Sequence, residues 1–179
     1  MSLAILGFGT AVPSATISQQ DALGIAKSLC NGTSEQATWL PAMYGGTGIV
    51  TRQTCLGSAF VTDLVNETEH SGSVFLPKRT HADRGPSTHQ RMLFYQKMAP
   101  ELALRSSGCA LAQAGLLPTE ITHLITVSCT GFTAPGFDVE IIKELGLSSN
   151  VERTHVGFMG CHGALNGLRV ANAFASADP

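Results

Sequence analysis

Short apolar runs alternate with longer amphipathic stretches along this chain. A short apolar run predicts a buried strand, and apolar residues at helical spacing predict a helix. The strands expected on this basis are 3–8, 123–129 and 153–158, and the expected helices are 18–30, a long helix from 88, 139–145 and 161–175. Residues 31–86 are rich in Gly, Thr and Ser, which predicts loops with short strands. This alternation is typical of an α/β fold with a parallel or mixed sheet.

Capping and helix-breaking residues indicate where these elements begin and end. Ser18, with Asp21 three residues later, predicts a capped helix start. Asp138 predicts a second capped start, before a helix that Gly146 ends. Pro100 should kink the long helix or divide it in two, because proline cannot donate a helical hydrogen bond.

The last predicted helix has one face of small residues. Gly163, Gly167 and Ala171 follow one another at four-residue spacing, so they share one side of the helix. A small face allows a neighbouring element to approach closely. We therefore expect a central helix that is sandwiched between other elements.

Cys161 stands where the 153–158 strand gives way to this helix, among glycines at 157, 160 and 163. The unpaired N–H groups and the positive dipole end of a helix start favour the thiolate, which is the nucleophilic form of cysteine. Free cysteines are more often small buried hydrophobic residues. The glycines favour a nucleophile here, because they allow a substrate to approach the sulfur. Three strand ends, near 10, 130 and 160, are expected at one sheet edge, where α/β sheets bind ligands.

The composition excludes several classes of function. The chain has 179 residues, which predicts one domain, and 44% of them are hydrophobic, 13% are charged and the net charge is −2. The low fraction of charged residues indicates extensive burial, and the net charge of −2 argues against nucleic-acid binding. The five cysteines, at 30, 55, 109, 129 and 161, form no CxxC pair, so no metal site is expected. Neither a membrane span nor a signal peptide is predicted, which indicates a cytoplasmic protein.

Three segments resemble type III polyketide synthases, the chalcone and stilbene synthase family: residues 3–13 (LAILGFGTAVP), 121–138 (ITHLITVSCTGFTAPGFD) and 157–164 (GFMGCHGA). The resemblance is closer to bacterial members than to plant ones and runs in order along essentially the whole chain. It implies a thiolase-like α/β fold, of which residues 1–179 form the N-terminal half, with a mixed sheet and a buried nucleophile helix. The C-terminal half of the family has no counterpart in this sequence.

The resemblance implies an acyltransferase of polyketide biosynthesis that acts as a homodimer. The Cys161 thiolate would take an acyl group from acyl-CoA, and malonyl-CoA would then lose carbon dioxide to give an enolate that attacks this acyl group. The substrates are coenzyme A thioesters, and no cofactor is expected. Family members draw their catalytic His and Asn from the C-terminal half, and no position here matches either. The isolated chain is therefore expected not to complete the condensation.

Four further positions are implied to bind substrate. Cys129 and Thr130 match the wall of the acyl pocket, although a strand-end cysteine that merely packs is an equal alternative. Ala134 stands where plant relatives often carry a Met that reaches into the partner subunit's cavity, so the size of the accepted substrate stays open. Arg52 is the one basic residue that remains near the position of the family's coenzyme A tunnel.

Three histidines are candidates for the missing base, and two other functions are alternatives to polyketide synthesis. Neighbouring helical residues point about 100° apart, so His162 is expected to pack or to support the site rather than to act as the base for Cys161. His123 and His155 lie in predicted strands, and their spacing assigns them no role. A ketoacyl synthase of fatty-acid type has the same fold, but the 130–136 loop favours the polyketide family. A catalytically inert half that only associates is the non-enzymatic alternative.

Overall fold

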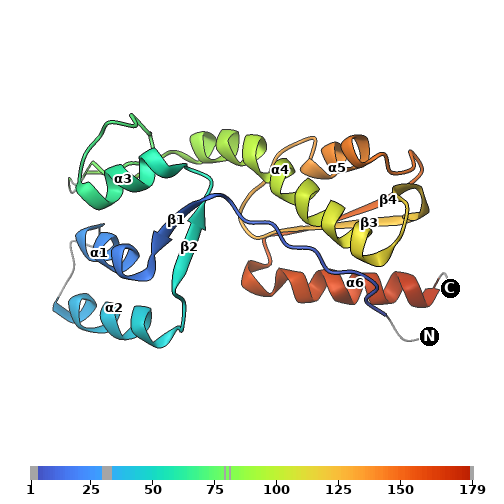
Figure 1. Cartoon of the computed structure of the whole chain (residues 1–179), viewed down its shortest axis with the longest axis horizontal. Coiled ribbons are helices and arrows are strands. Elements are labelled where there is room, and N and C mark those ends of the chain that lie inside the picture. The colour runs from blue at the N-terminus through green and yellow to red at the C-terminus, as the bar shows by residue number, and fades with distance from the viewer. Residues whose placement is uncertain (1–3, 30–33, 79, 81, 178–179) are drawn as a thin grey trace. The chain divides into compact units, whose positions relative to one another are not determined.

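The computed structural model describes residues 4–29, 34–78, 80 and 82–177. Its contacts divide the chain into two compact units, Met1–Ala11 with His89–Pro179, and Val12–Thr88. Figure 1 labels the helices and strands of both. The length alone predicts one domain, whereas residues 12–88 build a small sheet and helices of their own. No helix in the described part of the chain has the length and apolar character needed to cross a bilayer.

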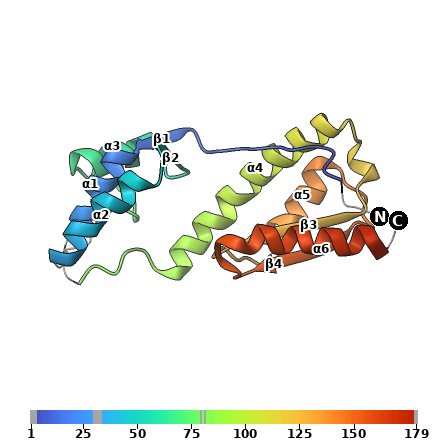
Figure 2. The same ribbon diagram turned by 90° about the horizontal axis from the view of Figure 1, so that it is seen from below.

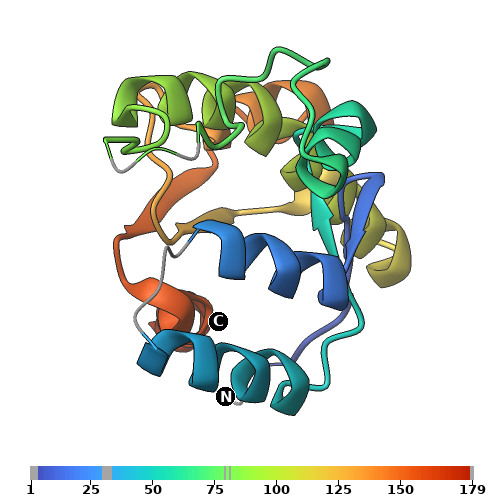
Figure 3. The same ribbon diagram turned by 90° about the vertical axis from the view of Figure 1, so that its left-hand side faces the viewer.

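The unit of residues 12–88 is built on a two-stranded antiparallel sheet. Strand β1 (Ala15–Ser18) pairs with β2 (Thr51–Thr54), and Ala15 lies opposite Thr54. Three helices complete it, of which the first two lie side by side (Figure 3): α1 (Gln19–Leu29), α2 (Ser34–Gly46) and α3 (Ser58–Asn66). The prediction of loops with short strands over 31–86 is therefore right for β2 and wrong for α2 and α3. Tertiary packing decides these helices, since Leu40 and Phe60 are buried.

The start of α1 confirms the predicted cap. The Ser18 hydroxyl donates to the Asp21 carboxylate at 2.6 Å and accepts from the backbone N–H of Asp21 at 3.0 Å. This side chain satisfies one of the N–H groups that a helix start leaves unpaired. The helix is described as far as Leu29, and Cys30, its expected end, lies outside the described residues.

A buried carboxylate holds the segment that follows α3. Asp63 is 2% exposed and accepts hydrogen bonds from the Thr68 hydroxyl at 2.5 Å and from the backbone N–H groups of His70 and Ser71 at 3.0 and 2.6 Å. Hydrogen bonds from Ser71 and then from Thr68 hold the pKa of the Asp63 carboxyl well below its usual range. Asp63 thus fastens residues 68–71 to the helix.

The second unit is a parallel strand pair covered by helices on both faces. Strands β3 (His123–Ser128) and β4 (Glu152–Gly157) pair in parallel, with Ser128 opposite Gly157. Helices α4 and α5 cover one face and α6 the other (Figures 1 and 2), with two short 3-10 turns: α4 (Thr88–Ala114), η1 (Pro118–Glu120), α5 (Phe137–Leu145), η2 (Gly160–His162) and α6 (Gly163–Ala177). The predicted α/β class is confirmed, as two separate two-stranded sheets.

Two of the predicted breaking and capping signals act differently in the structure. Helix α4 continues through Pro100 as one helix, so the division, one of the two predicted effects, does not occur; one proline removes only one hydrogen bond from a long helix. Helix α5 begins at Phe137 with Gly136 as its N-cap, so Asp138 lies in the first turn and pairs with Arg153 of β4 at 3.0 Å instead of capping. Gly146 ends α5 in the left-handed conformation, as expected.

The small face of α6 packs directly on strand β3. A Cβ at Gly163 would lie 3.0 Å from Val127 Cγ1, and one at Gly167 would lie 2.8 Å from Val127 Cγ2. A methyl group at either glycine would press on Val127, so a small face at this contact is confirmed. Leu165 and Leu168 are 58% and 47% exposed, so α6 is covered on one side only rather than sandwiched.

The predicted strand at residues 3–8 is wrong. The described residues from Ala4 form no strand, and the side chain of Ile5 is 70% exposed. The segment lies against α4 (Figure 2): a Cβ at Gly9 would meet the Ser106 carbonyl oxygen at 2.0 Å, and the Phe8 N–H donates to the Gln113 side chain. The backbone groups of a helix interior are already paired, so α4 offers this segment no ladder of hydrogen bonds.

Candidate active site

Two loops leave the same edge of the β3–β4 pair. Ser128 and Gly157 are partners at the ends of the two parallel strands, and the Phe158 N–H donates to the Ser128 carbonyl at 3.2 Å. Residues 129–136 therefore start beside residues 158–162. Of the three strand ends expected at one edge, those near 130 and 160 are confirmed, and the one near 10 does not exist as a strand.

Cys161 lies in the 3-10 turn η2, directly before α6, and its side chain is exposed. The chain reaches this turn through two left-handed residues, Phe158 with φ 59° and Gly160 with φ 67°. Glycine adopts that conformation freely, but for phenylalanine it costs on the order of 1–3 kcal/mol. The surrounding structure has to hold Phe158 in place, and through it the position of Cys161.

Aromatic contact joins the two loops. The rings of Phe132 and Phe158 lie 5.8 Å apart between centroids, so the loop after β3 touches the turn that leads to Cys161. Cys129 and Thr130 are exposed and follow β3 directly. Ala134 is exposed in the same loop, and its peptide bond to Pro135 is cis. The β3–β4 edge thus brings together Cys161 and three of the four predicted substrate-binding residues.

Arg52, the fourth, belongs to the other unit. It lies on β2, where its Nε donates to the Gln19 side chain at 2.8 Å and its guanidinium lies 5.4 Å from the centroid of the Tyr44 ring. It is not among the residues that the β3–β4 edge collects.

Two successive hydrogen bonds, which the sequence did not predict, link helix α4 to the 129–136 loop. The Tyr95 hydroxyl on α4 donates to Ser128 Oγ at 2.9 Å, and Ser128 Oγ donates to the Gly131 carbonyl at 2.8 Å. No motif in the sequence gives Tyr95 a role in the site. Its ring also lines a pocket of about 280 Å³ together with Phe132, Phe137, His155 and Phe158.

Of the histidines at 123, 155 and 162, only His162 belongs to the cysteine turn itself. His155 Nδ1 shares a hydrogen bond with Thr126 Oγ1 at 2.8 Å on the sheet face opposite α6. His123 stands at the start of β3, with Nε2 3.6 Å from a Glu152 carboxylate oxygen. His162 follows Cys161 and is exposed, so it does not pack within this unit, and its supporting role stays a prediction. Among the described residues, no cluster of three or more His, Cys, Asp or Glu side chains could hold a metal ion.

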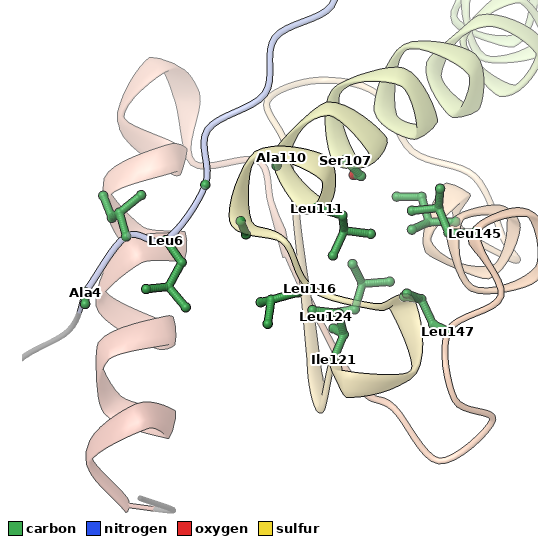
Figure 4. A pocket seen from close by; sticks show the side chains of 14 residues that line it. Ala4, Leu6, Ser107, Ala110, Leu111, Leu116, Ile121, Leu124, Leu145 and Leu147 are labelled. Carbon is green, nitrogen blue, oxygen red and sulfur yellow. The ribbon is translucent and has the colours of Figure 1, made fainter.

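A second cavity in this unit carries no catalytic chemistry. It measures about 410 Å³, and its walls come from the N-terminal segment, α4, β3 and α5. Figure 4 shows Leu6 of the N-terminal segment on one side and Leu145 and Leu147 on the other. Apart from Ser107 its lining side chains are apolar, and none belongs to the two loops at the β3–β4 edge.

Residues 2–179 match the family described as chalcone and stilbene synthases, N-terminal domain. The chain belongs to this family. This match confirms the resemblance carried by the three segments, and the structural similarity to family members confirms the thiolase-like fold.

Individual chalcone and stilbene synthase relatives agree over nearly the whole chain. The "Alpha-pyrone synthesis polyketide synthase-like Pks18" of Mycobacterium tuberculosis is 34% identical over 177 residues, which are 98% of this chain and 40% of that protein. The crystal structure of PKS-I from the brown alga Ectocarpus siliculosus superposes with a TM-score of 0.70 at 29% identity, over 98% of this chain and 45% of that one.

A variant of CsyB complexed with CoA-SH superposes with a TM-score of 0.74 at 26% identity, over 99% of this chain and 42% of that one. The name csyB belongs to an acylalkylpyrone synthase of Aspergillus oryzae. The chain thus spans less than half the length of these relatives.

Proposed function

We propose that this chain carries the acyl-loading site of a type III polyketide synthase. The Cys161 thiolate attacks the carbonyl carbon of an acyl-CoA thioester. The new bond joins Sγ to that carbon, the bond from the carbon to the coenzyme A sulfur breaks, and coenzyme A leaves as a thiolate that takes up a proton. The acyl group then sits on Cys161 as a thioester.

One observation carries this proposal: the parallel register of β3 and β4 delivers an exposed cysteine and the 129–136 loop to one edge. An acyl group on Cys161 lies where Cys129 and Thr130 emerge, which suits the assignment of these residues to the acyl pocket wall. The bend at Phe158 and Gly160 leaves the sulfur at the start of α6 rather than within the strand.

The relatives support coenzyme A thioesters as the substrate class. A CsyB variant was solved with CoA-SH, and other relatives are named for polyketide or pyrone synthesis. Arg52 is proposed to contact coenzyme A, since its guanidinium is exposed and cationic. The loading step needs no cofactor or metal. We further propose that the protein acts as a homodimer in the cytoplasm.

The second step, condensation, requires more than the described residues offer. Malonyl-CoA must lose carbon dioxide, and the resulting enolate must attack the acyl carbon while Cys161 leaves as a thiolate. Donors must already point at the developing oxyanion, and the loss of one such donor typically costs ~100- to 1,000-fold in rate. No position in this chain matches the family's catalytic His or Asn, so we expect the 179 residues alone to load an acyl group slowly and to make no polyketide.

Mass spectrometry of the chain incubated with acyl-CoA, with and without malonyl-CoA, tests the proposal. We expect one acyl group, mapped to the Cys161 peptide, and no polyketide product. Cys161→Ser should abolish the thioester adduct, and Cys109→Ser, at an exposed thiol on α4, should leave it unchanged. An adduct that persists in Cys161→Ser would refute the assignment of the nucleophile. Polyketide formation by the chain alone would show that one of its own histidines serves as the missing base.

A further inference from the structure

Cys129 and Thr130 lie inside a small hydrogen-bonded ring. Ser128 and Gly131 flank this pair, and the hydrogen bond from Ser128 Oγ to the Gly131 carbonyl, at 2.8 Å, closes the backbone around it. The conformation of the pair therefore depends on where the Ser128 hydroxyl points. A serine hydroxyl can donate only one hydrogen bond, and here the Gly131 carbonyl accepts it.

The Tyr95 hydroxyl determines that direction. It donates to Ser128 Oγ at 2.9 Å and so occupies the acceptor side of the serine, which leaves the serine proton for Gly131. The Tyr95 ring also covers Gly131, where a Cβ would come within 2.1 Å of the ring carbon Cε2. At the far end of the loop, Tyr95 meets Phe137 edge-on, with 6.3 Å between ring centroids. One side chain of α4 thus contacts Ser128 just before the 129–136 loop, Gly131 within it and Phe137 just after it.

We propose that Tyr95 is a positioning residue that sets the acyl-group preference of Cys161 through Ser128 and the Cys129–Thr130 pair. This inference rests on the proposed function and adds a specificity determinant to it. Tyr95 lies on the sheet face opposite α6, and its hydroxyl bonds Ser128 rather than any residue of η2. Loss of the hydroxyl alone should therefore act on the pocket wall and leave the surroundings of the sulfur unchanged. Acyl selectivity should therefore change without a change in thiol reactivity.

The test compares acetyl-CoA with dodecanoyl-CoA in competition for Cys161, read as the ratio of the two adducts by mass spectrometry. Tyr95→Phe deletes only the tyrosine hydroxyl, and Ser128→Ala deletes the serine hydroxyl that accepts its hydrogen bond. We expect each to change the adduct ratio by about five-fold, the effect of one neutral hydrogen bond. Because both variants break the same series of hydrogen bonds from Tyr95 through Ser128 to Gly131, the double variant should change the adduct ratio no further than a single variant does.

A matched control and a second readout separate positioning from general structural damage. Ser106→Ala removes another α4 hydroxyl, one that donates to the Ala103 carbonyl within the helix, and should leave the adduct ratio unchanged. The rate of Cys161 alkylation by iodoacetamide should stay within about two-fold in all variants, because that small reagent does not need the pocket wall.

The outcomes are distinguishable. If the unaltered chain is acylated but neither variant changes the ratio, the role of Tyr95 is refuted and the proposed function stands. A parallel fall of acylation and alkylation also refutes it, since the residue would then act on the fold as a whole. If the unaltered chain takes up no acyl group from either thioester, the proposed function fails and this inference falls with it.

Discussion

The contact between α6 and β3 allows a quantitative prediction for the helix that follows Cys161. Gly167→Ala adds a methyl group 2.8 Å from Val127 Cγ2, whereas carbon atoms prefer about 3.5–4.0 Å. Forcing such a group into a packed site costs about 1–3 kcal/mol. Alanine also favours the helix over glycine by about 1 kcal/mol. The free energy of unfolding should therefore fall by about 1 kcal/mol, near the middle of the resulting range.

A double-mutant cycle with Val127→Ala isolates the clash. Val127→Ala alone should destabilise the unit, because it empties the space beside Gly167. In the double variant the new methyl group of residue 167 fills part of that space. The two changes together should therefore cost at least about 1 kcal/mol less than the sum of the single variants. Urea denaturation followed by far-ultraviolet circular dichroism measures all four proteins.

Gly108→Ala is the matched control for this cycle. Gly108 lies within α4, and no heavy atom beyond its own helix backbone stands within 4 Å of its Cβ position. Alanine should stabilise the protein there by about 1 kcal/mol through helix propensity alone. An equal stabilisation by Gly167→Ala, or a cycle that is additive within about 0.5 kcal/mol, would contradict the predicted clash.

Three further predictions concern reactivity, acid stability and association. Iodoacetamide at pH 6.5 with peptide mapping should modify Cys161 fastest of the five thiols, and faster labelling of Cys109 would contradict this. Because the folded state lowers the pKa of Asp63, its stabilisation is present above the unfolded value of about 3.9 and is lost as pH falls below it. Urea titrations from pH 5 to 2.5 should show less of that loss in Asp63→Asn, and an identical pH slope would refute it. Analytical ultracentrifugation should show association at micromolar concentration, with exposed Leu165 and Leu168 available to bury, and a clean monomer would count against it.

The sequence by itself determined the elements around the nucleophile. The apolar run of β3, the Gly146 helix end and the small face of α6 are local signals, each caused by a few neighbouring residues. The position of Cys161 between a strand and a helix followed from them. The family could be identified for a similar reason, since its motifs are short and contiguous.

Other features depend on partners that are distant in the sequence. The segment from Ala4 has the pattern of a buried strand, yet a strand exists only where another strand pairs with it, and this segment lies on helix α4. Helix α2 was hidden by Pro41 and its glycines, and packing decides it. The left-handed Phe158 carries no sequence signal, because its conformation is imposed by its surroundings.

The residues of the candidate site could be predicted from the sequence, but their arrangement could not. Cys161, Cys129, Thr130 and Ala134 could be named from motifs, but only the parallel register of β3 and β4 places their loops at one edge. The Tyr95 hydrogen bond to Ser128 joins residues 33 positions apart, on a helix and a strand. A helical apolar stripe predicts that a tyrosine faces the core, and it does not predict which hydroxyl that tyrosine meets there. Such a pairing is decided by the tertiary structure, because it depends on how α4 lies across the sheet.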